Sequence, residues 1–298
     1  MGHRQSRHTK SNVMGHQVRF HPDSKQVSKA CRRRFLKGWS FPSAKHKKNF
    51  IDFKFYQFGC AAFPDSLSER FPLIVDFTTV MLLLNDIIDT MQGKDRVDYA
   101  LRIISIFEGR VEPQTPVEQF SARVFAPIAE AGEWHVWDII EGIRKFVDAA
   151  QVPTKDVTTL RHYIQVESNA GYPYYSALMR YSLALKYQPQ QDLRIMGIDK
   201  VAACQALIFN DLVCFDHKCK LNEILFCAVK VMVEHEKRDI KTAKEIILLM
   251  AMEMYDVVVY GTELLANDTS ISQDAKVYLL ALPWFLSGHE HWIASIYK

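Results

Sequence analysis

The chain has 298 residues, of which 48% are hydrophobic and 24% charged, and its formal net charge is +3. Its twelve glycines and eleven prolines are few for this length, which argues against collagen, small disulfide scaffolds and turn-rich β-sandwiches and favours helix. The apolar content is sufficient for a sizeable core, so the composition also excludes a chain that is disordered throughout.

Positive charge is concentrated near the N-terminus. Residues 1–50 contain 13 Lys/Arg and a single acid, Asp23, giving a local balance of +12, whereas the remaining 248 residues carry a balance of −9. We expect a basic, partly disordered arm over residues 1–40 and a helical domain over residues 41–298. Three interpretations of the arm stay open: a solvated tail, a segment that binds nucleic acid or an anionic membrane, and a segment that folds over an anionic ligand.

Helical periodicity fills the rest of the chain and is interrupted at prolines and glycines. The predicted helices cover about 67–91, 117–130, 134–150, a stretch from 153 disturbed at Gly171 and Pro173, and then about 199–236, 241–266 and 272–298. No alternating strand pattern, internal repeat or interdomain linker is evident. The sequence therefore predicts one all-α domain, a helical bundle.

Cysteine spacing and hydropathy indicate the compartment. The six cysteines form no C-x-x-C pair and no zinc-binding spacing, so we expect them to behave as small buried apolar residues. The first 30 residues lack the apolar core of a signal peptide, and the longest apolar stretch, near Leu82, is interrupted by Asn85 and Asp86. We expect a soluble cytoplasmic protein without stable membrane insertion.

A first polar motif ends the apolar segment at 82–90. Asn85, Asp86 and Asp89 are spaced three and four residues apart, which places them near one face of a helix. Oxygen ligands in this arrangement suit Mg²⁺, especially an ion shared with a phosphate group. The alternative is a polar helix end that projects into solvent.

A second polar motif follows 124 residues later. Asn210, Cys214 and Lys218 share one helical stripe, and Asp211 adjoins them in an otherwise apolar segment. Polar groups in a buried helix require partners. The alternative to a binding role is that Asn210 satisfies a neighbouring backbone group.

Together the two motifs resemble those of the class I terpene synthases, particularly the fungal group that includes trichodiene synthase, from about Phe41 to Lys298. In that family two such motifs hold three Mg²⁺ ions that bind the diphosphate of a prenyl substrate. The resemblance implies the terpene synthase helical bundle, Mg²⁺ as cofactor, and catalysis that depends on Asp86 and Asp89. It places the following residues at metal-ligand positions: Asn85, Asp86, Asp89, Asn210 and Cys214.

The motifs depart from the family pattern at several positions. Asn85 replaces the leading Asp, Cys214 replaces a Ser, and Lys218 replaces a Glu. A thiol is a poor Mg²⁺ ligand and an ammonium is not one. Lys218 could instead contact the diphosphate directly.

Other family positions imply further diphosphate contacts. A Trp in the family's last helix precedes an Arg by six residues; here Trp292 precedes Lys298. The family's diphosphate-sensing Arg corresponds to Gln165, with Arg161 one turn earlier. Arg33 of the basic arm could close over the anion. The expected diphosphate-binding residues are Lys218, Lys298, Arg161, Gln165 and Arg33.

Aromatic side chains suit a pocket that stabilises carbocations. Phe77 and Met81 precede Asn85 by eight and four residues and share its stripe, and Tyr174 and Trp284 are further expected pocket residues. The hypothesis is a non-standard cyclase that ionises a prenyl diphosphate, with farnesyl diphosphate as substrate, and forms a sesquiterpene. The alternative is a catalytically decayed or repurposed protein of this fold that binds a terpenoid or rearranges one without metal. We expect no nucleic-acid partner, and a homodimer is one option for its assembly.

Overall fold

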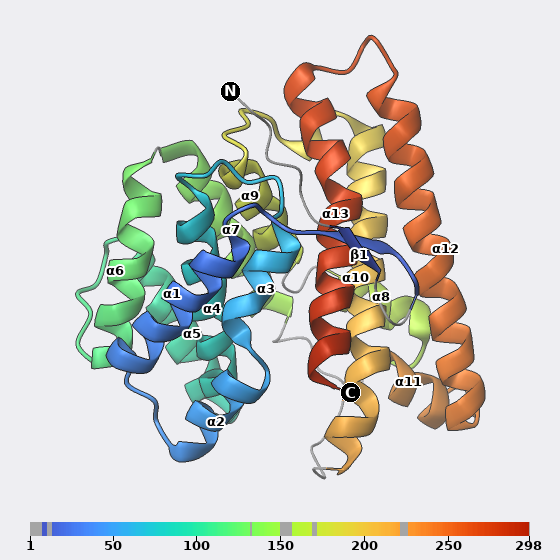
Figure 1. Ribbon diagram of the computed structural model, residues 1–298. Coiled ribbons are helices and arrows are strands. Elements are labelled where there is room, and N and C mark those ends of the chain that lie inside the picture. Colours follow the sequence, from blue (N-terminus) through green and yellow to red (C-terminus); the bar gives the residue numbers. More distant parts are fainter. Residues whose placement is uncertain are drawn as a thin grey trace.

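The computed structural model describes residues 8–10, 14–131, 133–149, 157–168, 172–220 and 226–297. Two short strands precede a series of helices (Figure 1). In chain order these are β1 (His8–Lys10), β2 (Gln17–Arg19), α1 (Ser24–Gly38), α2 (Ala44–Asp52), α3 (Phe55–Ala62), α4 (Phe71–Ile88), α5 (Gly93–Phe107), α6 (Pro116–Glu130), α7 (Glu133–Ala149), α8 (Leu160–Glu167), α9 (Tyr172–Ser182), the 3₁₀ turn η2 (Pro189–Gln191), α10 (Leu193–Lys220), α11 (Ala228–Glu234), α12 (Ile240–Ala266) and α13 (Gln273–Ile296).

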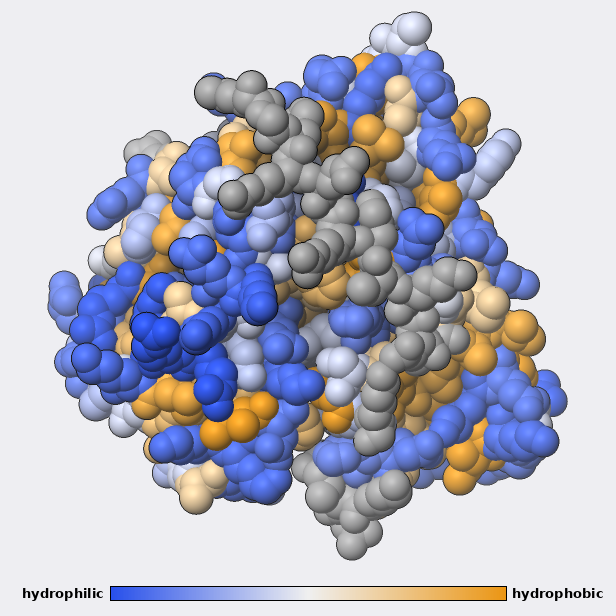
Figure 2. Space-filling model, in the orientation of Figure 1, coloured by the Kyte–Doolittle hydropathy of each residue, from blue (hydrophilic) through white to orange (hydrophobic). Residues whose placement is uncertain are grey.

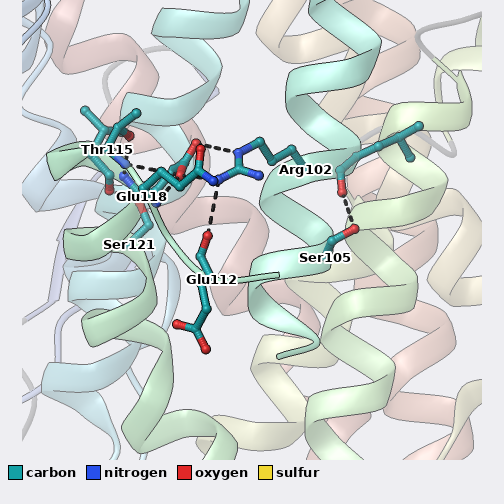
Figure 3. Close-up of polar contacts among 9 residues, drawn as sticks. Arg102, Ser105, Glu112, Thr115, Glu118 and Ser121 are labelled. Atoms are coloured by element: carbon teal, nitrogen blue, oxygen red, sulfur yellow. Dashed lines mark hydrogen bonds and ion pairs between the residues drawn. The ribbon is translucent and has the colours of Figure 1, made fainter. Parts of the chain in front are cut away.

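Local sequence signals set the helix starts. At α6 the hydroxyl of Thr115 accepts a hydrogen bond from the Glu118 amide, and the Glu118 carboxylate accepts one from the Thr115 amide, which forms a capping box. Arg102 of α5 donates two hydrogen bonds of 2.9 Å to the same carboxylate, so the cap also fixes α5 beside α6 (Figure 3). Asp239 and Ser272 cap the N-termini of α12 and α13, where their side chains accept hydrogen bonds from the amides of Thr242 and Ala275.

The helices are arranged so that α10, α12 and α13 lie side by side, with α3 packed against α13 and α4 packed against α3 (Figure 1). Gly288 permits the close approach of α13 to α3, because a Cβ atom there would lie 2.0 Å from the carbonyl oxygen of Ala61. Gly142 does the same between α7 and α9, where a Cβ would lie 2.5 Å from the Cα of Tyr174. The all-α bundle expected from the sequence is confirmed.

Several elements differ from the sequence prediction. The helix expected over 67–91 is α4, Phe71–Ile88, and the stretch from 199 to 236 is divided into α10 and α11. Residues 93–107, for which no helix was predicted, form α5. In the fold, α5 packs against α6 and α7.

The N-terminal region contains more structure than its charge suggested. Although no strand was predicted, β1 and β2 pair antiparallel, with Thr9 opposite Val18. Residues 24–38 form α1, and Cys31, Phe35 and Trp39 are buried with the body of the bundle. These residues follow one another at intervals of four, so they form one apolar stripe along a helix whose other faces are basic.

The segment before α1 lies across α13. Arg19 forms an ion pair with Asp65, and its guanidinium carbon lies 4.4 Å from the centre of the Trp284 ring. His16 Nδ1 lies 2.8 Å from Glu290 Oε2, whose carboxylate also accepts from the Met14 amide. These contacts join the N-terminal segment to α13 and to the loop after α3.

Within the described residues, α4 is the helix long and apolar enough to cross a membrane, and 67% of it is buried inside the fold. Burial of this kind is typical of the central helix of a bundle.

Candidate active site

The first polar motif lies at the C-terminal end of α4. Asn85 and Asp86 are half-buried in its last turn, and Asp89 is the exposed residue that follows the helix. Asp86 Oδ1 accepts a hydrogen bond of 2.8 Å from Asn49 Nδ2 of α2, which holds this carboxylate in place. Asn85 Nδ2 donates to Asp89 Oδ2 at 2.9 Å. The structure therefore brings the three predicted residues together at one end of the bundle.

A cation that the sequence analysis did not identify lies beside this motif. Arg96, in the first turns of α5, places Nη2 3.2 Å from Asp89 Oδ1. The only signal for Arg96 in the sequence was that a basic residue stands seven positions after Asp89, with a turn between the two. Because Arg96 partly neutralises Asp89, a bound metal ion would share or displace this contact.

The second polar motif lies in the C-terminal half of α10. Cys214 is buried, and its thiol donates to Asn210 Oδ1 across 3.7 Å. Asp211 Oδ2 accepts from the Tyr163 hydroxyl at 2.6 Å and from the Ala228 amide at 2.9 Å. Asp211 therefore ties α10 to α8 and α11. The Lys218 side chain and the whole of Lys298 lie outside the described part of the chain.

The donor sets of the two motifs differ in their suitability for Mg²⁺. Asp86 and Asp89 supply the carboxylate oxygens that a hard cation prefers. Asn210 supplies one amide oxygen, already in contact with the Cys214 thiol, and a thiol is a poor Mg²⁺ ligand. Among the described residues, no group of three or more His, Cys, Asp or Glu side chains is arranged to hold a metal. The first motif thus fits a Mg²⁺ ion that is shared with a phosphate, whereas the second offers one amide oxygen and a soft sulfur atom and is the weaker donor set.

Helix α8 contributes a further carboxylate that the sequence analysis missed. Burial raises the pKa of Glu167 to about 7; the negative charge of Asp211 adds to this shift and the positive charge of Arg96 opposes it. Glu167 therefore lies in the electrostatic field of both the α4–α5 junction and α10. Arg161 and Gln165, the expected diphosphate contacts on α8, are both exposed.

The expected pocket residues lie in different surroundings. Phe77 is fully buried, with its ring centre 5.2 Å from that of Phe125 in α6. Tyr174 is buried and its ring centre lies 3.9 Å from that of Tyr175, whereas Trp284 is half-buried under Arg19. Met81 is half-buried. Arg33 lies exposed on α1.

An aromatic cluster joins α3, α9 and α13 in the centre of the bundle. The ring centre of Phe58 lies 5.1 Å from that of Tyr175 and 4.9 Å from that of Trp292. His289 packs on the same cluster, with its ring parallel to Phe285 and edge-on to Phe58. Burial lowers the pKa of His289 to about 4, so the imidazole is neutral near pH 7, and its buried Nδ1 atom has no hydrogen-bond partner among the described residues.

Comparison with known proteins places this architecture among terpene cyclases, although no family model matches the chain. Aristolochene synthase from Penicillium roqueforti is 28% identical over 292 residues, which cover 91% of this chain and 83% of the relative. Aristolochene synthase from Aspergillus terreus is 24% identical over 283 residues, covering 91% and 88%.

Solved structures agree with these relatives. The crystal structure of the P. roqueforti aristolochene synthase has a TM-score of 0.78 at 28% identity and covers 92% of this chain and 95% of its own. Germacradien-4-ol synthase from Streptomyces citricolor has a TM-score of 0.73 over 96% of this chain and 98% of its own. At 13% identity, this second likeness concerns the fold alone.

Proposed function

We propose that this chain, which belongs to the class I terpene synthases and is related to the fungal aristolochene synthases, ionises farnesyl diphosphate and cyclises the resulting carbocation to a sesquiterpene. Sesquiterpene cyclisation is the activity common to these relatives. The observation that carries the proposal is the position of Asp86 and Asp89 at one end of a bundle that matches those relatives over nearly its whole length.

Asp86 and Asp89 are the residues that we propose to hold Mg²⁺. When bound, Mg²⁺ neutralises the charge of the departing diphosphate as a Lewis acid. Asn49 orients Asp86 by its hydrogen bond, and Arg96 restrains Asp89. Asn85 and Asn210 remain proposed ligands of secondary importance, and Cys214 is the weakest of the set because of its soft sulfur atom.

Cationic side chains are proposed to replace the metal contacts that the second motif lacks. An ammonium or guanidinium group can donate charge-assisted hydrogen bonds directly to diphosphate oxygens. Arg96 already lies at the first motif and is well placed for this role. The sequence-based proposals that accompany it are the cations Lys218, Lys298, Arg161 and Arg33 and the uncharged Gln165.

The aromatic cluster around Phe58 is proposed to face the hydrocarbon chain during cyclisation. Ring faces stabilise a carbocation by cation–π interaction, and the cluster also excludes water. We assign the final proton transfer to His289. A C–H bond next to the cationic carbon breaks, its electron pair forms the new C=C bond, and the proton passes to Nδ1 of the neutral imidazole.

A second candidate function is metal-independent binding or rearrangement of a neutral terpenoid. It is favoured by one observation, the contact of the Cys214 thiol with the oxygen of Asn210, which places a soft atom where a Mg²⁺ ligand is expected. Both functions would use the same apolar interior.

Incubation of the protein with farnesyl diphosphate, with and without Mg²⁺, distinguishes the two. Cyclic sesquiterpene and released diphosphate that appear only with Mg²⁺ support the cyclase. If neither cyclic sesquiterpene nor diphosphate appears, and a neutral sesquiterpenoid binds saturably, the metal-independent function is supported. We propose further that the enzyme is a soluble cytoplasmic protein that acts on this small molecule without nucleic acid, and that it can form a homodimer.

A further inference from the structure

A groove on the outside of the bundle lies between α1, α4 and α6. Its volume is about 480 Å³, which falls in the range of about 300–1,000 Å³ that is typical of small-molecule sites. Three cationic side chains line it: Arg34 and Lys37 from α1 and Arg123 from α6. Hydrophilic side chains gather over α1 on the face shown in Figure 2, with hydrophobic ones beside them.

Asp76 lines the groove from α4 and is only 4% exposed. Its Oδ2 atom forms an ion pair with Arg34, whereas Oδ1 is buried without a hydrogen-bond donor among the described residues. A buried acceptor without a donor is costly for a folded protein. A ligand that offers a hydroxyl or P–OH group to Oδ1 would remove this cost.

The charge of the groove determines the rest of the ligand. With three cations and one carboxylate, the lining has a net charge of about +2 at neutral pH. A phosphate monoester has an average charge of about −1.5 to −2 at pH 7, which matches the cations, and its monoanionic fraction keeps a P–OH group that can donate to Oδ1. A guanidinium has five N–H donors, which leaves Arg34 able to bind Asp76 and a phosphate together.

Apolar side chains form the remaining wall: Leu73, Phe120 and Val124. Gly38 allows the end of α1 to approach this wall, because a Cβ atom there would lie 2.7 Å from Phe120 Cε2. Pro127, inside α6, also lines the groove. The groove thus combines an anion-binding end with a hydrocarbon-binding surface.

We propose that this groove between α1, α4 and α6 is a second binding site that accepts a free amphipathic phosphate, an alkyl or prenyl chain that ends in a phosphate monoester. The size of the groove favours a free molecule over a bilayer surface. The site is separate from Asp86 and Asp89 and does not depend on the proposed cyclase activity.

Octyl phosphate, kept below its micelle-forming concentration, is a suitable probe, and calorimetric titration of the full chain measures its binding. We expect saturable one-to-one binding. Arg123→Gln, which removes a cation, and Val124→Glu, which adds a carboxylate to the apolar wall, should each weaken it about tenfold or more. Lys29→Gln is the matched control, because Lys29 is an exposed cation of α1 that does not line the groove. Circular dichroism confirms that each variant is folded.

Several outcomes would overturn the proposal. Equal weakening by Lys29→Gln would indicate non-specific attraction to a basic surface, and equal affinity for inorganic phosphate would remove the role of the apolar wall. Weakening by Asp86→Ala but not by Arg123→Gln would move the binding to the candidate active site. Binding to phosphatidic acid vesicles, with no binding of monomeric octyl phosphate, would identify a membrane contact instead.

Discussion

Arg96 Nη2 lies 3.2 Å from Asp89 Oδ1, so a cation already occupies one side of the carboxylate that we propose as a Mg²⁺ ligand. Both side chains are well exposed, and water therefore weakens their attraction. A ligand that binds Asp89 more strongly can therefore displace Arg96. It connects the end of α4 with the start of α5, and this connection gives the first prediction.

Arg96→Gln should lower the Mg²⁺ concentration needed for half-maximal turnover, by about two- to fivefold, because the competing cation is removed. If Arg96 also donates to the diphosphate, the maximal rate at saturating Mg²⁺ should fall. Product formation measured across a Mg²⁺ titration separates these two effects. An unchanged Mg²⁺ requirement together with an unchanged maximal rate would remove Arg96 from the site.

Asp86→Ala should abolish turnover, since Asp86 supplies one of the two carboxylates of the first motif. Asn49→Ala should give an intermediate loss, because the carboxylate remains but loses the hydrogen bond that orients it. Asp52→Ala, on the same helix α2 as Asn49 but exposed and paired with Lys48, is the control and should retain full activity. Near-normal product from Asp86→Ala would contradict a metal-assisted mechanism.

Replacement of Cys214 and Lys218 by the family residues tests whether the second motif is adapted or decayed. If Lys218 binds the diphosphate, Cys214→Ser combined with Lys218→Glu should weaken diphosphate binding. If the motif has decayed, the same change should create oxygen ligands and strengthen Mg²⁺-dependent binding. Calorimetry with inorganic diphosphate at fixed Mg²⁺ gives opposite signs for the two cases.

The sequence predicted the composition of the first motif better than its surroundings. Asn85, Asp86 and Asp89 follow helical spacing, so their common location could be read from the chain. Asn49 and Glu167 could not, because they reach the site from α2 and α8 through tertiary packing. Likewise, the charge of residues 1–50 obscured the buried stripe of Cys31 and Phe35 in α1.

The protonation of Glu167 should make the free energy of unfolding depend on pH. Its pKa is about 7 in the folded protein because of burial, whereas the ordinary value is 4.5. As the pH rises from about 4.5 through about 7, the unfolded chain loses this proton before the folded protein does, so the free energy of unfolding decreases. Glu167→Gln should therefore stabilise the protein by ~1–3 kcal/mol at pH 8 and have little effect near pH 4.5. Urea unfolding at the two pH values measures this, and equal effects at both would contradict it.

His289→Phe should change the product rather than abolish the reaction. The substitution keeps an aromatic ring beside Phe58 and Phe285 but removes the Nδ1 lone pair that we propose as the proton acceptor. Ionisation takes place at the other end of the substrate, so diphosphate release should fall less than about threefold. The carbocation must then lose its proton elsewhere or react with water, which should yield new double-bond isomers or alcohols in the volatile products.

The wild-type product ratio should also stay constant between about pH 5.5 and 8, because burial holds the pKa of His289 near 4 and the imidazole remains neutral throughout that range. Phe285→Leu is the matched control in the same cluster: it removes a ring that carries no lone pair, so it should slow turnover without generating the new isomers. If wild-type protein releases no diphosphate from farnesyl diphosphate, the cyclase proposal itself fails. If it does and His289→Phe gives the wild-type product profile, only the assignment of the proton acceptor fails.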